Sequence, residues 1–215
     1  MHKISTTALL AVIFAAFCIP PLGASPPEYC GSLEEPVTDK QNFSFAVWGD
    51  PQVAAPNPKH GPDMNFDRKA ETANPRLKKT VRLTNKLAPE FVVTVGDNIH
   101  GSGQIEHYRT LVELVEPLQS PLFMPIGNHD WTGRAERYTN NVSNRPFSNF
   151  LWAQKQVGAP ELINYSFNAG KWHFVVFAEP GGGGGGISGF FREHPGYLEW
   201  LKRDLRRNSD RPTMF

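Results

Sequence analysis

Three short polar segments carry the residues of this chain whose types and spacing could do chemistry. Residues 49–52 read Gly-Asp-Pro-Gln, residues 96–98 read Gly-Asp-Asn, and residues 127–130 read Gly-Asn-His-Asp. Carboxylates, side-chain amides and an imidazole would meet if these segments converge. Such oxygen and imidazole ligands suit hard or borderline divalent metal ions. The sequence therefore predicts a metal site.

The elements around these segments predict that they converge. Each segment follows an apolar, strand-like run, at 43–48, 91–95 and 122–126. Two spacers, 76–88 and 107–118, carry apolar residues at helical spacing. Right-handed crossovers would therefore place all three segments at the carboxyl ends of parallel strands, where open α/β sheets build their sites.

Four side chains are candidate metal ligands. Asp50 and Gln52 lie two residues apart, so in extended backbone both could reach one ion. Asp97 follows the neighbouring strand and could bridge two ions, and Asn128 offers an amide oxygen. Two metal ions about 3.5–4 Å apart can generate hydroxide and stabilise an in-line phosphoryl displacement.

Three further residues are candidates for the same site. His129 would serve as a catalytic proton donor or as a positive partner of a phosphoryl group. Asp130 would be catalytic by orienting His129, as carboxylates behind functional histidines do. Three interpretations of His100 stay open: it is a metal ligand, a substrate contact, or a loop histidine with neither role.

The remaining chain predicts one domain at 41–215, after an exposed leader at 25–40. Residues 51–75 indicate a long loop, 163–168 and 172–178 a hairpin, and 195–207 a last helix, with another strand beginning at 212–215. We interpret the basic side chains of the 76–88 helix as a face that is exposed to solvent and binds no partner. Substrate choice would lie in the loops at 53–75, 100–106 and 131–160.

The first 24 residues predict a secretory signal peptide. A positive start at Lys3 precedes an apolar run at 8–19, two prolines and a small-residue stretch. The run is shorter than the ~20 residues that a membrane span requires. We expect a secreted or periplasmic protein that keeps no membrane attachment after cleavage. Cys30 would then be the only cysteine, which excludes an intrachain disulfide.

Composition supports a globular protein and argues against nucleic-acid binding. The chain has 215 residues, of which 40% are hydrophobic and 20% charged, and these values are ordinary for globular domains. The formal net charge is +1 and no basic stripe is visible, so the sequence indicates no nucleic-acid surface. It gives no indication of the oligomeric state.

The three motifs and their order along the chain resemble those of the calcineurin-like metallophosphoesterases. Their pattern is Asp-x-His, Gly-Asp, then Gly-Asn-His-Asp or Gly-Asn-His-Glu, and the match runs from about Phe43 to Phe215. The resemblance implies an α/β fold, a two-sheet sandwich flanked by helices. It also implies an enzyme that hydrolyses phosphate mono- or diesters with two divalent or trivalent metal ions (Fe, Zn or Mn). The substrate would be phosphorylated. Asp50 and Gln52 would hold one metal, Asp97 both and Asn128 the second, with His129 close to the phosphate.

Two departures from the family pattern leave two expectations for the function of this chain. Gln52 replaces the usual histidine, and the family's later histidine motifs do not occur before Phe215. The leading expectation is a C-terminally incomplete form of an enzyme, with weak metal retention and little hydrolysis by the 215 residues alone. The alternative is a non-catalytic relic or binding protein that keeps the fold.

Overall fold

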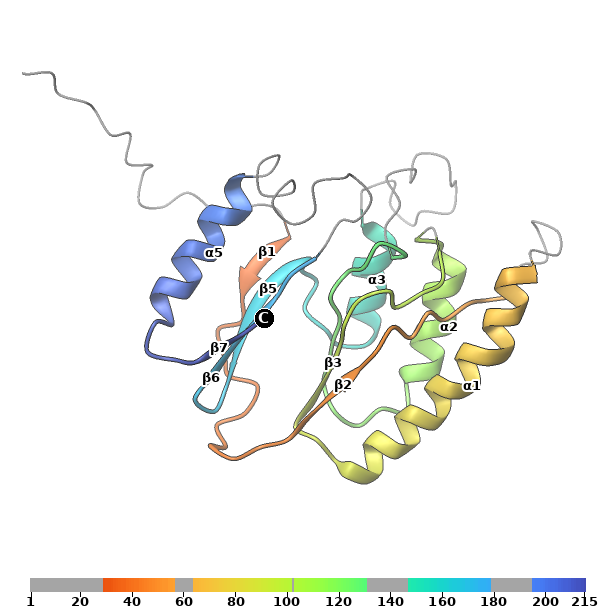
Figure 1. Cartoon of the computed structure of the whole chain (residues 1–215), viewed down its shortest axis with the longest axis horizontal. Coiled ribbons are helices and arrows are strands. Elements are labelled where there is room, and N and C mark those ends of the chain that lie inside the picture. The colour runs from red at the N-terminus through yellow and green to blue at the C-terminus, as the bar shows by residue number, and fades with distance from the viewer. Residues whose placement is uncertain (1–28, 57–63, 102, 131–146, 179–194) are drawn as a thin grey trace, which may run out of the picture.

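Two β-sheets face each other in the computed structural model, with helices on their outer sides (Figure 1). The structure describes residues 29–56, 64–101, 103–130, 147–178 and 195–215. The expected signal peptide at 1–24 lies outside these residues, as do parts of the expected loops 53–75 and 131–160. The two-sheet α/β sandwich is the fold class that the family resemblance implies.

The first sheet carries the three polar segments. Its strands β2 (Phe45–Trp48), β3 (Phe91–Thr94) and β4 (Leu122–Phe123) are parallel and lie in this order. Helix α1 (Met64–Leu87) connects β2 to β3, and α2 (Ile105–Val115) connects β3 to β4. The alternation of strands and helices confirms the predicted order, and it brings all three polar segments to one edge of the sheet.

The second sheet has the order β1-β5-β6-β7. Strands β5 (Asn164–Ala169) and β6 (Trp172–Val176) form the predicted hairpin, while β1 (Cys30–Ser32) and β7 (Thr213–Met214) add to it in parallel. Helix α5 (Pro195–Arg207) matches the predicted last helix and covers the outer face, where Trp200 packs with Cys30 and Val175.

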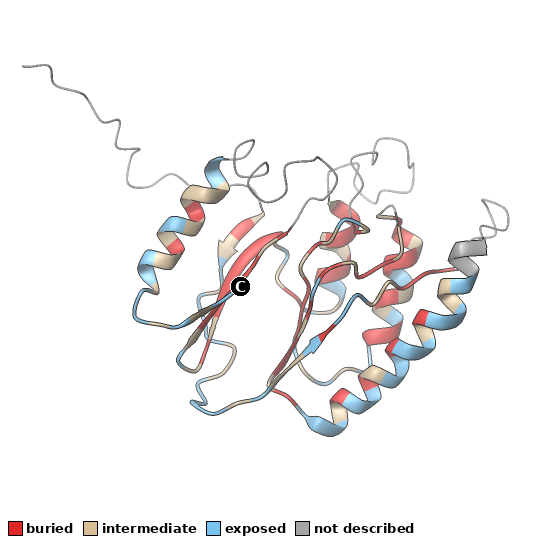
Figure 2. Ribbon diagram, viewed as in Figure 1, coloured by how far each residue is buried: buried red, intermediate tan, exposed pale blue. Residues whose placement is uncertain are grey.

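A cluster of aromatic rings joins the two sheets. Phe91 on β3 lies 5.3 Å from Phe174 on β6 and 5.4 Å from Phe167 on β5, measured between ring centroids, and both contacts are edge-on. Phe123 on β4 stacks on Phe167 at 4.2 Å. Such pairs add stability beyond the burial of their area. Figure 2 shows that the buried residues gather on these strands and on the inner faces of the helices.

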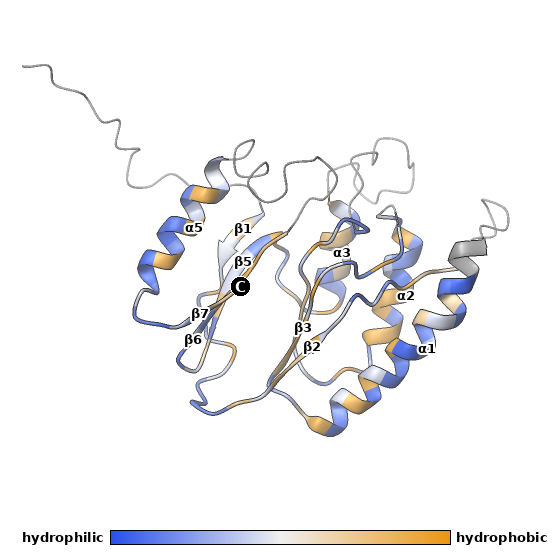
Figure 3. Ribbon diagram, in the orientation of Figure 1, coloured by the Kyte–Doolittle hydropathy of each residue, from blue (hydrophilic) through white to orange (hydrophobic). Residues whose placement is uncertain are grey.

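A second apolar cluster lies on the other side of the first sheet, under α1, α2 and α3 (Ser148–Gln156). Tyr108 and Leu111 on α2 and Phe150 on α3 are buried there. Figure 3 shows the corresponding division of each helix into an apolar and a polar face. None of the helices in the described part of the chain is long and apolar enough to cross a membrane.

Helix α1 corrects one expectation. It begins at Met64 and continues through Pro75, whereas the prolines predicted a loop over 51–75. The reason is a continuous buried stripe at Ala73, Leu77 and Val81, which extends the helix across the proline. The helix ends at Leu87, and Ala88 takes a left-handed backbone conformation before the next strand.

Two other elements were not predicted. Residues 30–32 lie in the expected exposed leader, but they pair with β5, and Cys30 is buried against α5. Helix α3 lies in the expected loop 131–160, where its sequence shows only weak periodicity. Both elements are stabilised by contacts with distant parts of the chain, which a local pattern does not reveal.

Candidate metal centre

Backbone hydrogen bonds place the first two polar segments side by side. Beyond the ends of β2 and β3, the Gln52 N–H donates to the Asp97 carbonyl at 3.0 Å and the Val53 N–H donates to the Asn98 carbonyl at 3.1 Å. The His100 N–H returns a bond to the Val53 carbonyl at 2.8 Å. The parallel pairing of the strands thus continues into the loops and fixes Gln52 beside Asp97.

Asp130 attaches the third segment to the second. Its carboxylate accepts hydrogen bonds from the backbone and side-chain N–H groups of Asn98, at 3.1 and 2.9 Å, and from the Ile99 N–H at 3.1 Å. The Gly127 N–H also donates to it, at 2.9 Å. Burial raises the pKa of Asp130 to about 7, and these donors limit that rise because they favour the charged form.

These contacts give Asp130 partners other than the expected one. Its carboxylate oxygens face Asn98, Ile99 and Gly127, whereas the carboxylate near the His129 ring is that of Asp97. The geometry therefore makes Asp130 a connection between two loops. An orienting effect on His129 stays a prediction.

Asp97 lies at the centre of the arrangement. Its backbone is in the left-handed region, at a φ of 47°, which turns the chain sharply after Gly96. Its Oδ1 accepts the His129 N–H at 2.9 Å, and its Oδ2 lies 3.8 Å from His129 Nε2. A Cβ at Gly127 would lie 2.3 Å from both the N and the Oδ1 of Asp97. The third segment can therefore wrap around Asp97 only because residue 127 is glycine.

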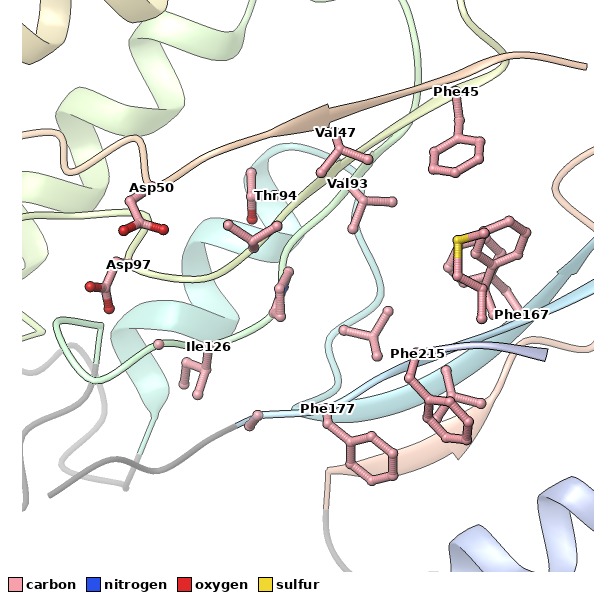
Figure 4. Close-up of a pocket in the computed structure, with 18 of the residues that line it drawn as sticks. Phe45, Val47, Asp50, Val93, Thr94, Asp97, Ile126, Phe167, Phe177 and Phe215 are labelled. Atoms are coloured by element: carbon pink, nitrogen blue, oxygen red, sulfur yellow. The ribbon is translucent and has the colours of Figure 1, made fainter. Parts of the chain in front are cut away.

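A cavity of about 940 Å³ between the sheets is lined by Asp50, Asp97 and Asn128. Figure 4 shows the carboxylates of Asp50 and Asp97 at the same end of the cavity, with Phe167 and Phe215 toward the other end. Asp50 and Asn128 are exposed, and Asp97 is half-buried. Three oxygen-bearing side chains from three loops thus share one opening.

Gln52 already has a cationic partner. Its side-chain oxygen accepts a hydrogen bond from the Lys69 ammonium on α1. Its backbone is left-handed, at a φ of 44°, so the expected extended geometry of residues 50–52 is wrong. That oxygen is the atom with which Gln52 would ligate a metal. An ion that uses it must displace Lys69 or share the oxygen with a positive charge, which is unfavourable.

The imidazole of His100 lies against that of His129. The two rings stack with their centroids 5.4 Å apart and an interplanar angle of 23°. His100 comes from the loop between β3 and α2 and is half-buried. This position beside the His129 ring is compatible with all three interpretations of His100, and the choice among a metal ligand, a substrate contact and a loop histidine with neither role stays a prediction.

The donor chemistry fits a metal in part. Asp50, Asp97 and Asn128 offer the oxygen atoms that a hard cation prefers. Within the described ranges, no group of three His, Cys, Asp or Glu side chains is arranged to hold an ion. The fit is therefore to one oxygen-rich position, and the described residues do not supply a full ligand set for two ions.

Sequence reasoning missed two side chains here. Lys69 lies in the stretch predicted to be a loop, so nothing indicated that a helix would bring it to Gln52. Asn98 was assigned no role, although it is fully buried and its Oδ1 accepts the Thr94 hydroxyl at 2.7 Å. An amide three residues after the end of the predicted buried strand 91–95 was the available signal for Asn98.

The two-sheet sandwich carries a polar loop cluster at the carboxyl ends of its parallel strands, which is where open α/β proteins bind their ligands. A family model, calcineurin-like phosphoesterase, matches residues 43–215. The chain therefore belongs to the calcineurin-like phosphoesterase family. A search of curated proteins finds no match to the chain.

Proposed function

We propose that this protein hydrolyses phosphate mono- or diesters with metal ions held by Asp50, Asp97 and Asn128. The observation that supports the proposal most strongly is that these three side chains line one cavity while Asp97 contacts His129. Family membership suggests the reaction class. We further propose that the centre is dinuclear (Fe, Zn or Mn) and that Gln52 becomes a ligand when Lys69 moves away.

The roles of the protein groups follow from their positions. A bound metal would polarise the phosphoryl oxygens and lower the pKa of a water molecule. Asp97 fixes the backbone of the third segment through the His129 N–H, and the His129 ring is about one-third exposed beside it. We assign to the His129 ring, which lies 3.8 Å from Asp97 Oδ2, the role of supplying a proton to the leaving oxygen.

The test is metal analysis combined with hydrolysis assays. The protein is stripped with a chelator, reloaded separately with Fe, Zn and Mn, and assayed with p-nitrophenyl phosphate and its bis-ester. We expect Asp97→Asn to lower bound metal and hydrolysis at least about tenfold, since even outer partners of metal ligands have effects of that size. Asp210→Asn, an exposed carboxylate on the last turn before β7, is the matched control. Unchanged metal content and hydrolysis in Asp97→Asn would contradict the proposal.

The second candidate is a non-catalytic binding protein. It is favoured by the lack of a three-residue His, Cys, Asp or Glu group in the described segments and by the Lys69 cation on Gln52. Under this alternative, phosphate esters bind without turnover, and added metals change neither binding nor thermal stability. Metal-dependent turnover abolished by Asp97→Asn would exclude it.

We also propose secretion, or export to a periplasm, after cleavage of residues 1–24. The support is the signal-like pattern of those residues. N-terminal sequencing of the protein recovered from its native host would test this proposal. A mature protein that retains Met1 would contradict it.

A further inference from the structure

We propose that a basic pocket beside the candidate metal centre binds a second phosphate group of the substrate. The inference rests on the proposed phosphoesterase function and deepens it, because it restricts the substrate to phosphoesters that carry another phosphate. The pocket measures about 820 Å³ and is lined by Arg68, Lys69, Thr72, Arg76 and His100.

Helical spacing gathers the basic side chains on one face of α1. Arg68, Thr72 and Arg76 follow each other at intervals of four residues, and Lys69 adjoins Arg68. The buried stripe of the same helix, at Ala73 and Leu77, points toward the sheet. The row of Arg68, Thr72 and Arg76 is exposed and lies beside the packing row, so the core does not require the charges of the two arginines. Lys69 lies on the packing row itself, four residues before Ala73.

The pocket is connected to the candidate metal centre at two points. Lys69 donates a hydrogen bond to the side chain of Gln52, which follows β2. His100 lines the pocket and stacks on His129 at 5.4 Å between ring centroids. A phosphate bound by the arginines would thus lie on the same side of the molecule as the proposed scissile group, separated from it by Lys69 and His100.

The charge of the pocket is one-sided. No Asp or Glu is among its lining residues, and within the described part of the chain neither Arg68 nor Arg76 forms an ion pair. Arg76 donates its Nε–H to the Thr72 carbonyl at 3.1 Å, which orients the guanidinium while its remaining N–H groups can still donate.

Phosphate is the anion that this arrangement suits. Arginine presents planar donors that pair with two phosphate oxygens at once, whereas lysine acts as a point charge. The volume of about 820 Å³ is in the range of ligand pockets and exceeds the needs of one inorganic phosphate. The substrate class that follows is a phosphoester with a second phosphate group, such as a bisphosphate or a diphosphate.

Binding of inorganic pyrophosphate to the metal-free protein tests the pocket. Titration calorimetry in a chelator at fixed ionic strength compares the wild type with Arg68→Ala/Arg76→Ala. We expect the double variant to bind at least about tenfold more weakly, since hydrogen bonds between charged groups are being lost. Lys78→Ala/Arg82→Ala is the matched control: it removes two exposed charges from α1 outside the pocket lining, and its affinity should stay within twofold. Circular dichroism verifies that all variants fold.

The outcomes separate this inference from the proposed hydrolysis. Because the titration contains no metal, a selective loss of binding in Arg68→Ala/Arg76→Ala supports the pocket even if the protein hydrolyses nothing. No pyrophosphate binding by the wild type, or equal weakening in both double variants, would overturn the inference. If the protein is active, the KM for a bisphosphorylated ester should rise at least about tenfold in the pocket variant. The KM for p-nitrophenyl phosphate should stay within twofold, and a parallel rise in both would also overturn the inference.

Discussion

At the scale of single residues, Asp97 is the side chain on which the candidate site depends most. It joins the second and third polar segments through His129, and it lines the cavity together with Asp50. Its left-handed backbone and its contact with Gly127 leave little room for change on either side.

We predict that Gly127→Ala destabilises the protein and displaces Asp97. The new methyl group would lie 2.3 Å from the N and the Oδ1 of Asp97, so the loop must shift, at a cost of about 1–3 kcal/mol. Urea denaturation measures the free energy of unfolding. Gly49→Ala is the control, because a Cβ there has no atom within 4 Å, and its change should stay within about 0.5 kcal/mol. Equal stability of both variants would contradict the close approach.

We predict that Lys69→Met strengthens metal binding. The ammonium group at the Gln52 oxygen repels an incoming cation, and a charge pair near a protein surface at about 4 Å is worth a few kcal/mol. Removing the charge should raise the affinity for Zn or Mn about tenfold in a competition titration with a chelator. Lys78→Met, on the same helix and exposed, should leave it unchanged. A weaker metal affinity in Lys69→Met would show that Lys69 supports the centre.

At the scale of elements, buried polar residues attach helices to the rest of the fold. Asp204 on α5 accepts from Ser32 on β1 and Ser166 on β5, at 2.7 and 2.8 Å, and pairs with His173 on β6 at 2.8 Å. Burial alone would raise the pKa of Asp204, but the hydrogen bonds from His173 and the two serines hold it below its ordinary value. This network fixes α5 on the second sheet. Helix α2 is attached in a similar way, because its His107 ring accepts a hydrogen bond from the Ala55 N–H in the loop after β2.

We predict that His107 makes the protein less stable in acid. The Ala55 N–H donates to His107 Nδ1 at 2.7 Å, which requires a neutral ring, and burial lowers the pKa of His107 from 6.5 to about 4. Between these values the unfolded chain binds a proton that the folded chain does not, so the free energy of unfolding falls as the pH falls from 6.5 toward 4.

Denaturation curves of the wild type and His107→Gln at several pH values in chelator measure this effect. Glutamine does not titrate, so the variant should lose less stability on acidification than the wild type. The comparison is needed because Asp130, whose pKa is raised to about 7, has the opposite effect: its contribution to the free energy of unfolding rises as the pH falls over the same range. Parallel pH profiles of the two proteins would show that His107 is not the responsible group.

At the scale of the whole molecule, stability depends on the aromatic contact between the sheets. Phe91 is fully buried and contacts rings of both sheets, among them Phe45 on β2 and Phe174 on β6. We predict that Phe91→Ala lowers the free energy of unfolding by about 3–5 kcal/mol, since a large cavity forms in the core. Leu87→Ala, at a side chain that is 77% exposed, should change it by no more than about 0.5 kcal/mol. A Phe91→Ala variant as stable as the Leu87→Ala variant would show that the sheets are not held together by this cluster.

The sequence by itself determined the order of the main elements and the edge at which the polar segments meet. Strand-like runs of five or six residues followed by Gly-Asp or Gly-Asn are local patterns. Parallel connections have a fixed hand, so Asp50, Asp97 and Asn128 could be assigned to one edge. The metal and catalytic roles of these residues stay predictions.

Only the tertiary structure decided which groups meet at that edge. Residues distant in the sequence meet in the Lys69 contact with Gln52, in the N–H groups of Asn98 that surround Asp130, and in the pairing of β1 with β5. The extension of α1 through Pro75 depends on packing against such distant residues. Local propensity records how each residue prefers to fold with its neighbours. A charge, a buried carboxylate or a short edge strand is stabilised by partners that the chain supplies only once it has folded.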